Sequence, residues 1–195
     1  MRQAEISRNT KETQIKIFLE LDGAGQNKIK TGCGFLDHML TLFAAHGRFD
    51  LIINCSGDVE VDYHHTVEDV GICLGQAFFQ ALGDKKGITR YGNIILQMDE
   101  ALILTAIDFS GRAYLNWDIN INAQKVGNFD TELAQEFWLG FVRNSLCTLH
   151  FKKFAGTNAH HIIECAFKAA ARSIAQAVKI NPEYKNEIPS TKGVI

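Results

Sequence analysis

The sequence predicts an α+β fold built by tandem duplication, with two similar half-domains that each carry a mostly antiparallel sheet and two helices on one face. Two observations predict this fold. Short stretches that alternate apolar and polar residues, typical of half-buried strands, are interspersed with longer stretches of helical periodicity. The motif His-His-x-x-Glu occurs twice, at 64–68 and 160–164, each time where a helical stretch begins. We therefore expect one half-repeat at 1–93 and another at 94–195, the second ending in a tail.

The expected elements of the first half follow in order. Alternation predicts a strand at 13–21, and after the turn at 22–25 residues 27–31 are expected to pair back as a hairpin. Apolar residues at helical spacing predict a helix at 35–46 that stops at Gly47. Strands are expected at 49–55 and 59–63. A second helix is expected at 66–82, ending at Gly83.

In the second half, the strand and helix patterns follow one another in the same order as in the first half. Strands are expected at 94–98, 101–109 and 113–119. A helix is expected at 131–145, with Asp130 or Thr131 available as its cap. A strand at 147–154 and a long alanine-rich helix at 159–178 follow, and Asn181-Pro182 ends that helix. The last stretch, 188–193, is expected to be irregular.

The composition argues against several classes of protein. The chain has 195 residues, 46% of them hydrophobic, and a formal charge of −2, so nothing favours binding to nucleic acid or to a membrane. No apolar run approaches the roughly 20 residues that span a bilayer, and the N-terminus lacks a signal core, so we expect a cytoplasmic protein. The five cysteines are scattered and never spaced Cys-x-x-Cys, which predicts reduced, buried thiols.

The doubled motif predicts a two-metal site. Imidazole and carboxylate ligands without thiolate favour manganese or iron over structural zinc. At the start of a helix, residues three or four apart share a face, so each motif glutamate can address the same ion as one of its histidines. Adjacent histidines point about 100° apart and can address different ions. One motif supplies too few ligands for two ions, so we expect the two motifs to face each other across a pseudo-twofold axis.

The repeat predicts two further ligands. His38 lies 26 residues before the first motif, and Glu136 lies at the corresponding place, 24 residues before the second. His46 and His150 are interpreted as structural or solvated. The predicted ligands number eight, four for each ion: His38, His64, His65, Glu68, Glu136, His160, His161 and Glu164.

Two aspartates near the first motif have two interpretations each. Asp62 and Asp69 could be carboxylates that orient the ligand rings. Equally, they could be a turn residue and a helix-start charge, and for Asp69 we favour that interpretation.

Basic residues predict an anion pocket beside the metals. Lys168 lies one helical turn after Glu164 and so faces the metal side. Arg90, Arg112 and Lys192 lie in expected loops and in the tail, where a single basic residue is more often a surface charge. Together the four suggest a phosphorylated or carboxylated substrate.

With these residues in place, the chain closely resembles the imidazoleglycerol-phosphate dehydratase family of histidine biosynthesis, over nearly its whole length. The stretches that carry the resemblance are Arg8–Thr13, Gly34–Leu40, Asp62–Asp69, Met98–Leu102, Asp108–Arg112, Asn158–Glu164 and Pro189–Gly193.

The resemblance implies a hydro-lyase that eliminates water from D-erythro-imidazole-glycerol phosphate to give imidazole-acetol phosphate. It implies two Mn²⁺ ions per active site, in a homo-oligomer of 24 subunits whose active sites form where subunits meet. One ion would be held by His38, His65, His160 and Glu164. The other would be held by His64, Glu68, Glu136 and His161.

The resemblance also implies roles in substrate binding and catalysis. Glu12 would be the catalytic carboxylate. The phosphate pocket would consist of Arg90, Arg112, Lys168, Ser190 and Lys192, the last two in the substrate-binding tail. Further substrate contacts would come from Glu12, His38, His64, His160 and Thr191.

The chain departs from the common family pattern at Glu136, where many members carry histidine. A carboxylate can ligate Mn²⁺, so the position is kept as a predicted ligand. Two other classes of function stay open. A dinuclear metallohydrolase acting on a small phosphate ester would use the same ligands to activate water. A non-catalytic, metal-stabilised assembly protein would need no anion pocket.

Overall fold

The computed structural model describes residues 2–195, and the two halves of the chain share one order of elements. The first half comprises β1 (Gln3–Asn9), β2 (Thr13–Glu20), β3 (Asn27–Lys30), α1 (Gly34–Gly47), β4 (Asp50–Gly57) and α2 (His64–Leu82). The second comprises β5 (Tyr91–Met98), β6 (Ala101–Asp108), β7 (Tyr114–Asp118), α3 (Leu133–Ser145), β10 (Thr148–Ala155) and α4 (Ala159–Val178). A small hairpin of β8 (Lys125–Val126) and β9 (Phe129–Asp130) precedes α3, and a 3-10 turn, η1 (Pro182–Tyr184), follows α4.

The two sheets have the same topology. Their strand orders are β1-β2-β4-β3 and β5-β6-β10-β7. In each sheet two antiparallel pairings are followed by one parallel pairing, of β3 with β4 and of β7 with β10. The predicted α+β fold of two similar halves is thus confirmed.

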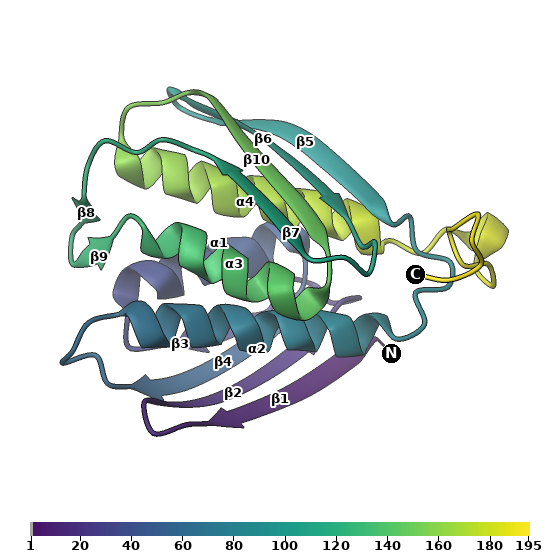
Figure 1. Cartoon of the computed structure of the whole chain (residues 1–195), viewed down its shortest axis with the longest axis horizontal. Helices are drawn as coiled ribbons and strands as arrows, with labels where there is room; N and C mark the ends of the chain where they lie inside the picture. The colour runs from purple at the N-terminus through teal and green to yellow at the C-terminus, as the bar shows by residue number, and fades with distance from the viewer. Residues whose placement is uncertain (1) are drawn as a thin grey trace.

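The four helices fill the space between the two sheets (Figure 1). Helix α2 lies on β1 and β2, and α4 lies on β5 and β6. The inward residues of β2, Ile15, Ile17 and Leu19, are almost fully buried, as strict alternation requires when one face of a sheet is covered. Between the halves, α1 packs on α4 and α2 packs on α3. Each motif helix therefore lies against the first helix of the other half.

Glycines allow α2 and α3 to approach each other closely. A Cβ atom at Gly71 would lie 2.3 Å from the carbonyl oxygen of Phe137, and one at Gly75 would lie 2.4 Å from that of Phe141. On the facing helix, a Cβ atom at Gly140 would lie 2.8 Å from the carbonyl oxygen of Glu68. Since these neighbours are backbone atoms, they cannot rotate away, and the position of α2 against α3 is fixed closely.

Helices α1 and α3 are equivalent, residue for residue, at an offset of 98 positions. Each ends at a residue in the left-handed conformation, Arg48 (φ 58°) and Leu146 (φ 53°). The six buried positions of α1, which are Leu36, Met39, Leu40, Phe43, Ala44 and Gly47, are all buried in α3 at this offset. His38 and Glu136 are likewise 98 positions apart, so they occupy equivalent places on the two helices.

Several sequence expectations were wrong in detail. Residues 27–30 form no hairpin with β2; they pair in parallel with β4 at the edge of the sheet. Residues 59–63 form turns and bends and no strand. Helix α3 begins at Leu133 after Glu132, without a side-chain cap, because Thr131 Oγ1 donates to the carbonyl oxygen of Ala123 at 2.8 Å.

Other elements had no counterpart among the expectations. Strand β1 and the β8–β9 hairpin were not predicted. The expected junction between residues 93 and 94 lies within β5, whereas the chain passes from one half to the other at 83–90. Across residues 2–195, no helix combines the length and the apolar composition that crossing a membrane requires. The cysteines are all unpaired, and four of the five are buried.

Candidate metal centre and anion pocket

Both motifs occupy the first turn of a helix, and a polar side chain fixes each start. Asn158 Oδ1 accepts hydrogen bonds from the backbone N–H groups of His160 (2.9 Å) and His161 (3.3 Å). Asp62 Oδ1 accepts from the backbone N–H of His64 at 2.7 Å. Such side-chain acceptors satisfy the free N–H groups of a helix N-terminus. Asp62 therefore acts as a turn residue before α2, which is one of its two predicted roles.

The closest cluster of possible ligands joins the two halves. His38 of α1 and His160 of α4 both place Nε2 near Glu164 Oε2, at 3.2 and 3.1 Å. The ligand atoms of these three residues lie within 4.8 Å of one another. Two imidazole nitrogens and one carboxylate oxygen, without thiolate, form a donor set that suits manganese or iron. Contact between α1 and α4 produces the cluster, which is why the motif alone did not contain His38.

Glu164 is only 6% exposed, and its carboxylate contacts Lys168, His38 and His160. Burial by itself would raise the pKa of this carboxyl group. The hydrogen bond and charge of Lys168, together with His160 and His38, hold the pKa below its ordinary value. Lys168 forms an ion pair with Glu164 Oε1, one turn along α4, so it faces the metal side as the spacing predicted.

The second group of predicted ligands is more open. His64 Nε2 lies 3.9 Å from Glu68 Oε2, one turn further along α2. Glu136 occupies on α3 the place that His38 has on α1, and α3 packs on α2 as α1 packs on α4. In residues 2–195, no ion pair joins Glu136 to His64 within 4.0 Å.

The remaining two histidines do not join the cluster around Glu164. Instead each holds a carboxylate with Nδ1: His65 lies 2.9 Å from Asp58 Oδ2, and His161 lies 2.7 Å from Glu100 Oε2. These hydrogen bonds raise the pKa of both imidazole rings, and the bond to His161 lowers the pKa of Glu100 to about 2. Sequence reasoning missed both carboxylates. The repeat carried a signal for Glu100, which precedes β6 as Glu12 precedes β2.

Asp69 has neither of the roles considered from the sequence. It is 6% exposed and points towards β1 and β2. It accepts hydrogen bonds from Arg8 Nε (2.9 Å) and from Thr13 Oγ1 (2.5 Å). It therefore orients no ligand ring and is no exposed helix-start charge, because it lies at the buried contact of α2 with the sheet.

Four of the five residues expected to bind phosphate, together with Thr191, line one cavity of about 320 Å³. Arg90, Arg112, Ser190, Thr191 and Lys192 are joined there by Tyr91, Ser110, Val194 and Ile195. Lys168 lies apart from this cavity, beside Glu164. Three cationic side chains, with the hydroxyl groups of Ser110, Ser190 and Thr191, suit an anion such as phosphate.

Asp108 holds Arg90 in place and was not predicted as a site residue. Its two carboxylate oxygens accept from Arg90 Nε (2.7 Å) and Nη2 (3.1 Å). Arg90 Nη1 donates to the carbonyl oxygen of Pro189 at 2.8 Å, so the same guanidinium also fastens the tail. The hydrogen bonds and charge of Asp108 raise the pKa of Arg90, and their effect is larger than the lowering caused by burial.

Glu12 lies in the loop between β1 and β2 with its side chain 54% exposed, and its Oε1 is 3.9 Å from His65 Nε2.

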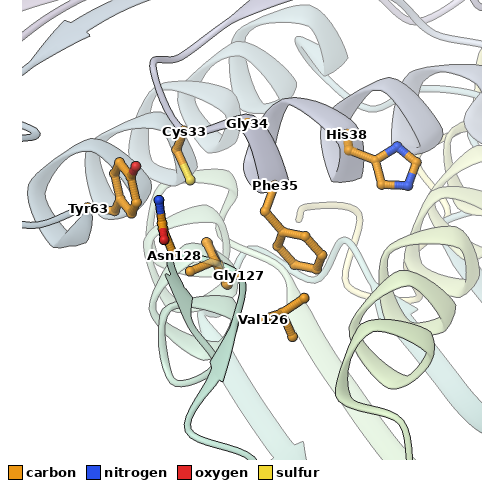
Figure 2. A pocket seen from close by; sticks show the side chains of 9 residues that line it. Cys33, Gly34, Phe35, His38, Tyr63, Val126, Gly127 and Asn128 are labelled. Carbon is orange, nitrogen blue, oxygen red and sulfur yellow. The ribbon is translucent and has the colours of Figure 1, made fainter.

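A second cavity, of about 340 Å³, lies beside α1 and the β8–β9 hairpin (Figure 2). His38 of the metal cluster lines this cavity beside Phe35, whose ring contacts both Phe129 (centroids 4.9 Å apart) and His160 (5.1 Å).

Comparison with known proteins assigns the family. The imidazoleglycerol-phosphate dehydratase family model matches residues 31–174. The imidazoleglycerol-phosphate dehydratase of Gluconacetobacter diazotrophicus is 53% identical, over 100% of this chain and 98% of its own length. That of Granulibacter bethesdensis is 54% identical, over 100% and 99%.

Solved structures agree with the sequence comparisons. The crystal structure of the enzyme from Staphylococcus aureus has a TM-score of 0.84 at 39% identity, covering 92% of this chain and 99% of that one. The Pyrococcus furiosus structure, in complex with (S)-C348, has the same TM-score at 38% identity, covering 97% and 100%. With its duplicated fold and its cluster of His38, His160 and Glu164, the chain belongs to the imidazoleglycerol-phosphate dehydratase family, hydro-lyases of histidine biosynthesis.

Proposed function

We propose that the chain catalyses the Mn²⁺-dependent elimination of water from D-erythro-imidazole-glycerol phosphate, giving imidazole-acetol phosphate. The observation that carries this proposal is the meeting of His38 with His160 and Glu164, residues from both halves, in a chain of this family. The cavity lined by Arg90, Arg112 and Lys192 supports a phosphorylated substrate over a neutral one.

The imidazole and carboxylate donors are of the type that suits Mn²⁺. His38, His160 and Glu164 would hold one ion, with His65 as the fourth ligand. The other ion would be held by His64, Glu68, Glu136 and His161. When bound, Mn²⁺ would supply Lewis-acid chemistry to the imidazole ring of the substrate.

Glu12 is proposed as the group that moves protons. Its exposed carboxylate would take the proton from the middle carbon of the glycerol chain, the second carbon from the imidazole ring. The C–O bond on the carbon next to the ring then breaks, and the departing hydroxyl group receives the proton and leaves as water. The resulting enol rearranges to the ketone. Arg90, Arg112, Ser190 and Lys192 would hold the phosphate, so that the reacting C–H and C–OH groups face Glu12.

We also propose a homo-oligomer of 24 subunits with active sites between subunits. The proposal is supported by His65 and His161, which lie away from the His38 cluster of their own chain and instead contact Asp58 and Glu100. A second copy could supply His65 to the His38 cluster and His161 to the ligands of the other ion. Sedimentation in the presence of Mn²⁺ should give about 24 times the 21.8 kDa of one chain, and a monomer would contradict the proposal.

One assay tests the reaction. Protein loaded with Mn²⁺ is incubated with imidazole-glycerol phosphate, and the enol or ketone product is followed by its absorbance and by mass spectrometry. Release of inorganic phosphate instead would identify the alternative function, a dinuclear metallohydrolase acting on a small phosphate ester. A folded, metal-loaded protein that forms neither product would refute both proposals.

A further inference from the structure

The duplication places two glutamates at equivalent positions with different surroundings. Glu12 lies one residue before β2, and Glu100 lies one residue before β6, the strand with the same place in the other sheet. Glu100 is fully engaged. One of its oxygens contacts His161 Nδ1 at 2.7 Å, and the other accepts from the backbone N–H groups of Thr157 (3.2 Å) and Asn158 (2.8 Å). Within residues 2–195, no hydrogen bond to the Glu12 carboxylate is found, and its side chain is 54% exposed.

In the first half, Asp58 and not Glu12 contacts the Nδ1 atom of the second motif histidine, His65. Asp58 follows the end of β4, and its oxygens lie 2.9 and 3.2 Å from His65 Nδ1. His65 and His161 are the equivalent second histidines of the two motifs. Each therefore has a carboxylate at Nδ1, but the carboxylate comes from a different loop of the half-repeat.

The position equivalent to Asp58 explains the difference. Strands β4 and β10 are each eight residues long, and the residue that follows β10 is Gly156. A Cβ atom at Gly156 would lie 2.9 Å from Ile162 and 3.1 Å from Ala101, and its backbone has φ +129°. The second half thus has no room for a carboxylate at this position, and Glu100 reaches the ring from the other loop.

A carboxylate at Nδ1 has a defined effect on a neutral imidazole. The ring carries one N–H, and a carboxylate can only accept a hydrogen bond, so the proton is held on Nδ1. Nε2 then keeps its lone pair and can ligate a metal, while the hydrogen bond fixes the orientation of the ring and increases its basicity.

We propose that Asp58 and Glu100 are positioning residues that hold His65 and His161 in the Nε2-ligating form, and that Asp58 leaves Glu12 free for proton transfer. This inference rests on the metal site of the proposed function. It predicts that equivalent glutamates in the two halves have different roles: Glu100 supports metal binding, whereas Glu12 does not.

The test compares three variants, Asp58→Asn, Glu100→Gln and Glu12→Gln, by the affinity of the assembled protein for Mn²⁺. Calorimetry gives the affinity, and the electron paramagnetic resonance signal of free Mn²⁺ checks it. Asp58→Asn and Glu100→Gln should bind about 10- to 100-fold more weakly. Glu12→Gln is the matched control, and its affinity should equal that of the wild type. The glutamine oxygen at position 100 still accepts from Thr157 and Asn158, so the loop that precedes α4 is preserved.

The outcomes separate the two proposals. If the wild type binds Mn²⁺ and turns over substrate but all three variants bind Mn²⁺ equally well, the positioning role is refuted and the proposed function remains. If the wild type neither binds Mn²⁺ nor forms product, the proposed function itself is refuted. Should one of the ring-contact variants fail to assemble, the other decides, because the two carboxylates act on different rings.

Discussion

Asp69 of α2 and Arg8 of β1 form a salt bridge 61 residues apart in sequence, with Asp69 Oδ1 2.9 Å from Arg8 Nε. Asp69 lies beside Glu68, and through Thr13 it also touches the loop that carries Glu12. The pair therefore fixes the motif helix against the strands that flank the proposed catalytic carboxylate.

Asp69→Ala is expected to lower the free energy of unfolding by about 1–3 kcal/mol, because Arg8 and Thr13 would lose their buried acceptor. Urea denaturation measures the change. Asp118→Ala is the control, since Asp118 and Lys152 form an exposed pair worth less than about 1 kcal/mol. Equal losses in the two variants would contradict a structural role for the buried pair.

Glu12→Gln is expected to lower kcat by about 10²–10⁴, the usual contribution of a general acid or base. Steady-state kinetics with Mn²⁺ and imidazole-glycerol phosphate measure it. Glu60→Gln removes an exposed carboxylate of the loop before α2 and should leave kcat unchanged. Unchanged turnover in Glu12→Gln would remove this residue from the proposed mechanism.

Asp108→Asn is expected to raise KM about tenfold with a smaller change in kcat. The amide cannot hold both Nε and Nη2 of Arg90 as the carboxylate does, so the proposed phosphate pocket loses its fixed guanidinium. Asp118→Asn, on β7 and away from the cavity, should have normal kinetics. A fall in kcat at constant KM would show that Arg90 acts in the chemical step and not in binding.

Gly71→Ala is expected to destabilise the fold by about 1–3 kcal/mol, because the new methyl group would overlap the carbonyl oxygen of Phe137. Thermal unfolding measures the loss. The control is Gly34→Ala at the start of α1, where a Cβ atom meets nothing within 4 Å and the change should stay within about 0.5 kcal/mol. A neutral Gly71→Ala variant would mean that α2 and α3 can move apart.

The buried thiols predict a loss of stability in alkaline solution. Burial raises the pKa of Cys147 and of Cys73 from an ordinary value of 9.0 to about 12. Unfolded thiols ionise at lower pH than native ones, so the unfolded state gains from ionisation first. The free energy of unfolding should therefore fall as pH rises from about 9 towards 12, and denaturation at pH 8 and pH 10.5 measures the fall.

Cys147→Ala removes one of these thiols and should show a smaller fall between the two pH values, even if its stability is lower at both. An equal fall in the variant would mean that other groups cause the alkaline destabilisation.

Local patterns predicted most of the elements but not their partners. The helix at 159–178 was predicted with its observed bounds, because its alanine-rich pattern and the Asn-Pro that follows it lie close together in sequence. The strand at 27–30 was expected in a hairpin, but its pairing with β4 depends on a contact formed only after α1 has crossed the sheet. Alternation shows that a segment is a strand and leaves its neighbour undetermined.

In the site, too, the sequence predicted residues within one element better than contacts between elements. The number of residues that separates each position from its motif predicted Glu136 as the counterpart of His38. The structure places both at equivalent positions of equivalent helices. The ring contacts of Asp58 and Glu100 were missed, because each carboxylate follows or precedes a strand, and strand ends vary in sequence. The sequence favours a helix-start charge for Asp69, because its partner Arg8 lies on β1, a strand that the sequence patterns did not predict.

The crossed packing of α1 on α4 and α2 on α3 has a consequence for the origin of the chain. The two contacts join equivalent pairs of helices, as in an isologous dimer whose two subunits have been joined end to end. A half-length ancestor could build this core, and a complete His38-type cluster, only by pairing with a copy of itself. Once the subunits were covalently linked, each copy could change without the other. Asp58 and Gly156, or His38 and Glu136, could then diverge at positions that a symmetric dimer would have kept identical.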